Sequence, residues 1–221
     1  MAVLLLTLFA LPVMTAGQTK QSDPSGGVVV DYMVATVNGE LITYSDLVWQ
    51  LALQTNTPIE PPRAEDLKRA FELLIDQRLI FQEAQKLPHI HAEDKEVEVA
   101  LAELARHFSS QEELRQRMTR VGLTSARLRE IVHERVDIEK YLNFRYRSFV
   151  VVTPKAIEDY YRESYVPRFR ARSPGTIVPQ LEKVRAEIEH TLTETRIESS
   201  IQGFLDESRQ RAEIVILRPI S

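Results

Sequence analysis

The first pattern along the chain is that of two strands. Residues 28–37 form a β-branched run, which Asn38-Gly39 separates from a second apolar run. An Asn-Gly pair in this position predicts a hairpin, because a type I′ turn needs positive φ at both central residues. Thr43 stands three residues before Asp46, the spacing of a capping box at the start of a helix. We therefore expect a β-hairpin that leads directly into a helix ending before Pro58.

Helical periodicity dominates the rest of the chain. Apolar residues recur at three- and four-residue spacing, and Pro and Gly interrupt the pattern at its ends. Ser and Thr stand where helix N-caps are expected. The predicted helices cover residues 64–87, 92–108, a short segment ending before Gly122, 124–148, and a segment that begins at Thr153-Pro154 and runs through Tyr165.

Residues 166–179 contain three prolines and one glycine, which predict a break between helices. A last long helix is expected from 180 to about 211, and its apolar face changes side near residue 195. Either the helix breaks between 193 and 200, or its two halves pack on different bodies. We favour the second reading, with the first half on or near the helices of 92–148 and the second half against the hairpin and the helix of 64–87, near Phe71 and Ile75. The two faces are Leu181, Val184, Ile188 and Leu192, and then Ile197, Ile201, Phe204 and Leu205.

The end of the chain, residues 213–217, reads as one more strand. A two-stranded hairpin is marginal by itself, so the terminal strand is expected to pair with it and to bury several aliphatic side chains. The predicted fold class is therefore mostly α, a multi-helix module with a small antiparallel sheet formed by the N-terminal hairpin and the C-terminal strand.

The first residues have the layout of a secretory signal peptide. Val3 to Met14 carry no charge, small residues follow at Thr15 to Gly17, and the chain then becomes polar. No Lys or Arg precedes the apolar run, and a misassigned start or a buried N-terminal helix is the alternative. The run is too short for a membrane span. We expect residues 1–17 to be removed on export, 18–27 to form a flexible leader, and the protein to be periplasmic without stable membrane insertion.

Composition and motifs point away from several functions. The formal charge is −4 with both signs interspersed, so no basic block indicates a nucleic-acid partner. Cysteine is absent. His89 and His91 could share a metal only with a third ligand from elsewhere, and an exposed helix start is the simpler explanation. No phosphate loop or nucleophile elbow is present. We expect no catalytic residues, no metal and no cofactor.

Aromatic residues and methionines offer the candidate binding surface. Most of them are explained as core and helix-packing residues. The functional alternative is that some line an apolar groove, because such side chains make adaptable contacts with apolar peptide segments. The candidates are Met33, Trp49, Phe108, Met118, Tyr141, Phe144, Tyr160, Tyr161 and Tyr165.

Three segments resemble one family. Residues 35–47, 71–84 and 152–161 are similar, in order and spacing, to segments of the SurA/PrsA group of exported foldases. The resemblance implies a helical chaperone module over 28–165, and a return of the C-terminus to that module over 180–221. In that family a parvulin-type prolyl isomerase domain usually follows the double-tyrosine helix. Here residues 166–179 form a linker where that domain would sit, and the segment is too short to hold it.

The resemblance and the missing catalytic set together lead to a functional expectation. We expect a non-enzymatic holdase that binds unfolded outer-membrane or secreted proteins through an apolar helical groove. One alternative is a dedicated assembly or structural subunit for a single envelope partner. A second is a peptidyl-prolyl isomerase with a rebuilt site. A homodimer is left open.

Overall fold

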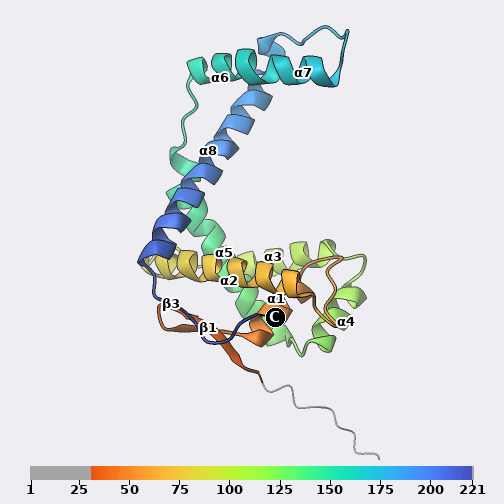
Figure 1. Cartoon of the computed structure of the whole chain (residues 1–221), viewed down its shortest axis with the longest axis vertical. Coiled ribbons are helices and arrows are strands. Elements are labelled where there is room, and N and C mark those ends of the chain that lie inside the picture. Colours follow the sequence, from red (N-terminus) through yellow and green to blue (C-terminus); the bar gives the residue numbers. More distant parts are fainter. Residues whose placement is uncertain (1–30, 221) are drawn as a thin grey trace, which may run out of the picture. The chain divides into compact units, whose positions relative to one another are not determined.

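The computed structural model describes residues 31–220, and the expected signal peptide and leader lie outside them. Two strands open this part of the chain and one closes it, with eight α-helices between them (Figure 1). The strands are β1 (Met33–Val37), β2 (Glu40–Thr43) and β3 (Ile214–Ile216). The helices are α1 (Tyr44–Ala52), α2 (Ala64–Gln85), α3 (Asp94–Arg106), α4 (Gln111–Arg120), α5 (Ser125–Arg145), α6 (Pro154–Tyr160), α7 (Val166–Arg172) and α8 (Leu181–Arg211), with a 3₁₀ turn η1 (Arg147–Phe149) and a π-helical segment η2 (Tyr161–Tyr165).

The predicted sheet is confirmed. Its order is β2-β1-β3, and both pairings are antiparallel. Asn38 and Gly39 have φ of 52° and 84°, which gives the left-handed turn that the Asn-Gly pair predicts. At the far end of the chain, the Asn38 N–H donates to Glu213 O at 2.8 Å, and the Leu217 N–H donates to Val34 O at 2.8 Å. The two ends of the described chain therefore meet in one sheet.

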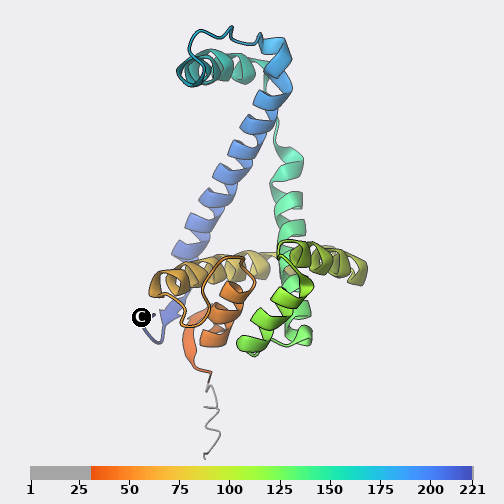
Figure 2. The ribbon, with the colours of Figure 1, turned by 90° about the vertical axis from the view of Figure 1, so that its right-hand side faces the viewer.

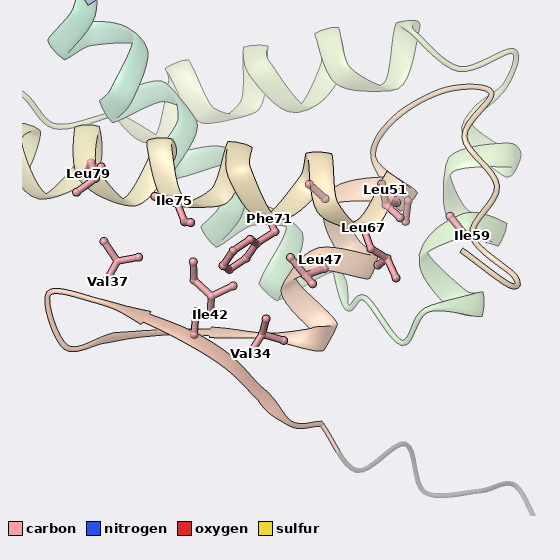
Figure 3. Packing of buried hydrophobic residues seen from close by; sticks show 13 residues of the cluster. Val34, Val37, Ile42, Leu47, Leu51, Ile59, Leu67, Phe71, Ile75 and Leu79 are labelled. Atoms are coloured by element: carbon pink, nitrogen blue, oxygen red, sulfur yellow. The ribbon is translucent and has the colours of Figure 1, made fainter. Parts of the chain in front are cut away.

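One face of the sheet packs on α1 and α2 (Figure 3). Val37 and Leu47 have no exposed surface, and Phe71 and Ile75 of α2 lie against them in the same cluster. The terminal strand contributes less than expected to this core. Ile214 is half-buried, but Val215, Ile216 and Leu217 are exposed, so the expectation of several buried aliphatics in this strand is wrong.

Three of the helix starts that the sequence predicts carry the expected caps. The Thr43 hydroxyl accepts from the Asp46 N–H at 3.2 Å, and Asp46 accepts from the Thr43 N–H at 2.9 Å, which completes the predicted capping box. Thr124 and Thr153 accept from the N–H three residues on, at 3.1 and 3.3 Å. The elements expected from periodicity are present within a few residues of their predicted ends.

Helix α8 is continuous over 31 residues, as the change of apolar face led us to prefer (Figures 1 and 2). The partners predicted for its first half are wrong. The first half packs on α6 and η2 through Val184 and Ile188, because residues 173–180 turn the chain back from α7 into α8.

The second half of α8 contacts α2, as predicted, and Arg209 bonds Glu72 and Asp76 there. Its apolar residues pack on α5 and the last turns of α2, where they contact Tyr141 and Ile80 in place of Phe71 and Ile75. The Phe71 and Ile75 face of α2 is already covered by the sheet.

The segment 166–179 contains a helix that the sequence analysis did not expect. Segment η2 precedes α7, and the Val166 N–H donates to Tyr161 O, five residues back. Pro167 follows this π-helical turn inside one continuous helical run over residues 154–172, and the irregular turn lets the run pass a residue that has no N–H. Pro174 and Gly175 come only after the last turn.

Candidate functional site

Helix α5 is held from one side by the start of α3. The buried Asp137 carboxylate accepts from the Ala92 N–H at 2.5 Å. The Lys140 ammonium donates to His91 O at 2.8 Å and to the Glu96 carboxylate at 2.7 Å. These bonds fix the N-terminal end of α3 against the middle of α5.

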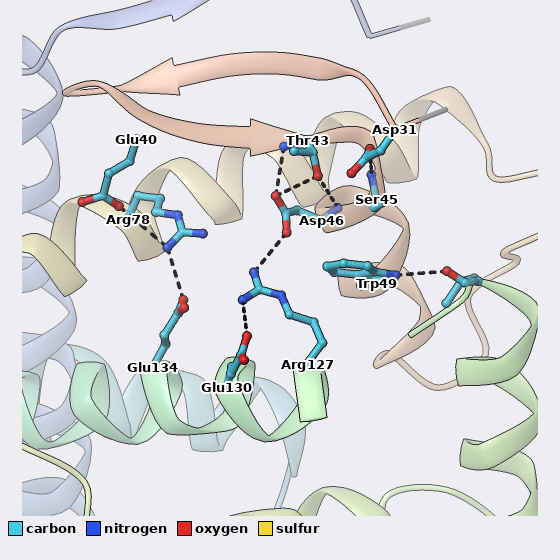
Figure 4. A network of polar contacts seen from close by, with 11 residues as sticks. Asp31, Glu40, Thr43, Ser45, Asp46, Trp49, Arg78, Arg127, Glu130 and Glu134 are labelled. Atoms are coloured by element: carbon cyan, nitrogen blue, oxygen red, sulfur yellow. Dashed lines mark hydrogen bonds and ion pairs between the residues drawn. The ribbon is translucent and has the colours of Figure 1, made fainter. Parts of the chain in front are cut away.

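A polar network holds α5 from the other side (Figure 4). The Arg127 guanidinium donates to the carboxylate of Asp46, which belongs to the capping box of α1, at 3.3 Å. The Arg78 guanidinium of α2 bonds the Glu134 carboxylate at 3.3 Å. Burial raises the pKa of Glu134, against the lowering effect of the nearby Arg78 and Arg127. The network positions α5 by partly buried charge pairs, and the arginines and carboxylates in it are paired with one another.

An open concave surface lies between α3 and α5, which we call the α3–α5 groove. Its volume is about 680 Å³. Its apolar lining is aliphatic, with Val99 57% exposed to solvent. Its charged rim carries both signs. The lining residues are Lys95, Glu96, Val99, Ala100, Glu103, Leu104, His107, Val136, Glu139, Lys140 and Asn143.

A second concave surface lies on the α8 side of α5, which we call the α5–α8 cavity. Its volume is about 270 Å³. Ile138 and Leu142 of α5 face Ile197 and Ile201 of α8 across it. The polar members of its lining are Gln77, Arg135, Glu139, Asn143 and Arg147.

Four of the residues singled out from the sequence belong to the helical core. Phe108 and Met118 are buried in one cluster with α3, α4 and α5, and Trp49 packs against it. The Trp49 Nε1–H donates to Val121 O at 3.0 Å. Tyr141 is buried in the separate cluster between α2, α5 and α8.

The other five candidates are more open. Tyr160, Tyr161 and Tyr165 pack, half-buried, against the first half of α8. Met33 is 53% exposed at the start of β1, and Phe144 is 44% exposed near the end of α5. The structure does not gather the nine residues on one surface, and their part in binding stays a prediction.

The aliphatic lining of the α3–α5 groove was not among the residues predicted to bind a ligand. One signal was present. Val97, Leu101 and Leu104 form the helical stripe of α3 that faces its neighbours, and Val99 lies off that stripe. An apolar residue on the second face of a short helix indicates either a further packing partner or an exposed apolar surface. Only the tertiary arrangement shows that Val99 is exposed.

The described part of the chain is a mostly helical module with a small closing sheet. Comparison with protein families identifies the family to which the chain belongs. The SurA-like N-terminal domain matches residues 1–142, more than half of the chain, and the chain belongs to this family. The family is of the chaperone type, and residues 31–220 contain no parvulin domain. A search of curated proteins found no match. In residues 31–220, no helix combines the length and the apolar character that crossing a bilayer requires.

Proposed function

We propose that this chain is a holdase-type chaperone that binds unfolded exported or outer-membrane proteins in the α3–α5 groove, without isomerase chemistry. The observation that carries the proposal is the groove itself, an open concave surface with an aliphatic lining and a volume of about 680 Å³. Membership of a chaperone-type family and the signal-peptide layout of residues 1–17 support it. The layout further supports action in the periplasm.

The chemistry of the groove suits clients of varied sequence. Val99, Ala100 and Leu104 offer apolar surface without a polar group that needs a fixed partner. Removing apolar surface from water is non-directional and roughly proportional to area, so the groove would accept many apolar segments. Rim charges of both signs, such as Lys95 and Glu103, select no single charge pattern.

The proposal predicts that the protein suppresses the aggregation of a denatured client at equimolar ratio, measured by light scattering. Val99→Asp should weaken client binding by roughly tenfold or more, because a client's apolar segment would desolvate the new carboxylate. Val99 is 57% exposed, so the substitution should leave the fold intact.

Ile177→Asp is the matched control. It introduces the same charge at a side chain that is 90% exposed between α7 and α8, outside the groove. It should leave the suppression of aggregation unchanged. Wild-type protein that fails to suppress aggregation, or equal losses in the two variants, would contradict the proposal.

A further inference from the structure

Arg135 is an arginine without a carboxylate partner in the middle of α5. Its Nη2 donates to the Gln50 side-chain oxygen at 2.7 Å. Its Nε is buried, with no hydrogen-bond partner among the residues that the structure describes. A guanidinium has five N–H donors and a fixed positive charge. Arg135 therefore has one buried donor and a charge that its surroundings leave unmatched.

The neighbouring carboxylates already have arginines of their own. Glu134 pairs with Arg78, and Asp46 pairs with Arg127, each at 3.3 Å. Within residues 31–220, no carboxylate forms an ion pair with Arg135. The field of Glu134 favours the charge, but burial has the larger effect and lowers the pKa of Arg135.

Arg135 stands in the wall between two spaces. On one side is a space of about 30 Å³ next to Gln50 and Glu134. Such a volume holds about one water molecule, which could accept from the Nε–H but would bring no negative charge. On the other side Arg135 lines the α5–α8 cavity, beside the aliphatic side chains of Ile138 and Ile201. An anion bound in this cavity would supply the negative charge that Arg135 has no partner for.

We propose that the α5–α8 cavity binds the C-terminal residue of an unfolded polypeptide, with the α-carboxylate on Arg135 and an apolar side chain among Ile138, Leu142, Ile197 and Ile201. Charge complementarity selects a carboxylate, and the aliphatic walls select the apolar group attached to it. The volume of about 270 Å³ suits one or two residues at a chain end. The proposal deepens the proposed function, on which it rests, by naming the feature of the client that this second surface recognises.

The two other charged groups on the cavity do not compete for this role. The Arg147 guanidinium is paired through two bonds, at 2.9 and 3.2 Å, with the Glu194 carboxylate. Glu139 opposes an anion, but its side chain is exposed, where water screens the repulsion. Arg135 is thus the cation on this cavity that has no anion.

The test compares three fluorescent peptides of alternating serine and leucine that end in leucine. The first has a free α-carboxylate, the second a C-terminal amide, and the third the same amide with one internal glutamate. Fluorescence anisotropy with the full-length protein should give a Kd roughly tenfold lower for the free carboxylate than for either amide, as expected for a charge-assisted hydrogen bond.

Variants then assign the preference to Arg135. Arg135→Gln keeps an N–H donor for Gln50 but removes the charge, and should bring the ratio of the Kd values close to one. Arg135→Lys should keep part of the preference. Arg147→Gln is the matched control on the same cavity and should leave the ratio unchanged.

Several outcomes would overturn the inference. A ratio near one in the wild-type protein does so without any variant. Equal binding of the internal-glutamate peptide would show that a chain end is not required. Displacement of the peptide by a fatty acid at lower concentration would point to a lipid instead. If aggregation is suppressed and Val99→Asp weakens that suppression while the peptide ratio stays near one, this inference fails and the proposed function stands.

Discussion

Ending the chain at Ala212 should lower the free energy of unfolding by about 3–6 kcal/mol, a large part of the roughly 5–15 kcal/mol that stabilises an ordinary domain. The deletion removes strand β3 and leaves backbone groups of β1 without partners, each at a cost of about 1 kcal/mol. It also removes the partly buried side chains of Ile214 and Ile220 and uncovers Val37, which has no exposed surface. Urea unfolding followed by circular dichroism measures the change.

Val215→Ser is the control that distinguishes the contribution of the backbone pairing of β3 from that of its exposed side chains. Val215 is 41% exposed, so this variant should unfold within about 0.5 kcal/mol of the wild type while it keeps the β3 pairing. An unchanged midpoint for the truncated chain would show that the sheet does not need its third strand.

Ile188→Asp should disrupt the packing between α6 and the first half of α8 and unfold α6, while the sheet and α2 stay folded. Ile188 is 1% exposed, between Ile157 and Val184. A carboxylate there is buried without a partner, which costs several kcal/mol in a small cluster. This cluster shares no residue with the one between the sheet and α2. Hydrogen exchange should therefore show lost protection in α6 and retained protection in α2.

His190→Asp is the control for that experiment. It places the same carboxylate two residues away on the exposed side of α8 and should leave the protection of α6 unchanged. Loss of protection in α2 on Ile188→Asp would show that the two clusters unfold as one unit.

Local chemistry explains which parts of the fold were predictable. The Asn38-Gly39 turn and the Thr43 capping box depend on a few adjacent residues, so the sequence specifies them directly. The pairing of β3 with β1 followed from the shortage of other strands. The helix α7 was missed because proline was taken as a break, whereas the helical run continues through Pro167 by way of the π-helical segment η2.

Partner choice was less predictable than local structure. The change of face in α8 is real, but periodicity does not say which surface each face meets. The sheet covers Phe71 and Ile75, so the second half of α8 packs further along α2, on Ile80 and Ala84. The groove depends on the same tertiary choice. Phe108 is buried in the core, whereas Val99 is exposed to solvent.

The central claim is that clients bind in the α3–α5 groove, and site-specific photo-cross-linking tests it most directly. A photo-reactive phenylalanine analogue replaces Val99 in one preparation and Ile177 in another, and both are irradiated with an equimolar denatured client. Both positions are exposed, so intrinsic accessibility does not favour the groove. The account predicts abundant client adducts at position 99, which excess unlabelled client reduces, and few at position 177. Equal yields at the two positions, or adducts at position 99 that excess client does not reduce, would contradict it.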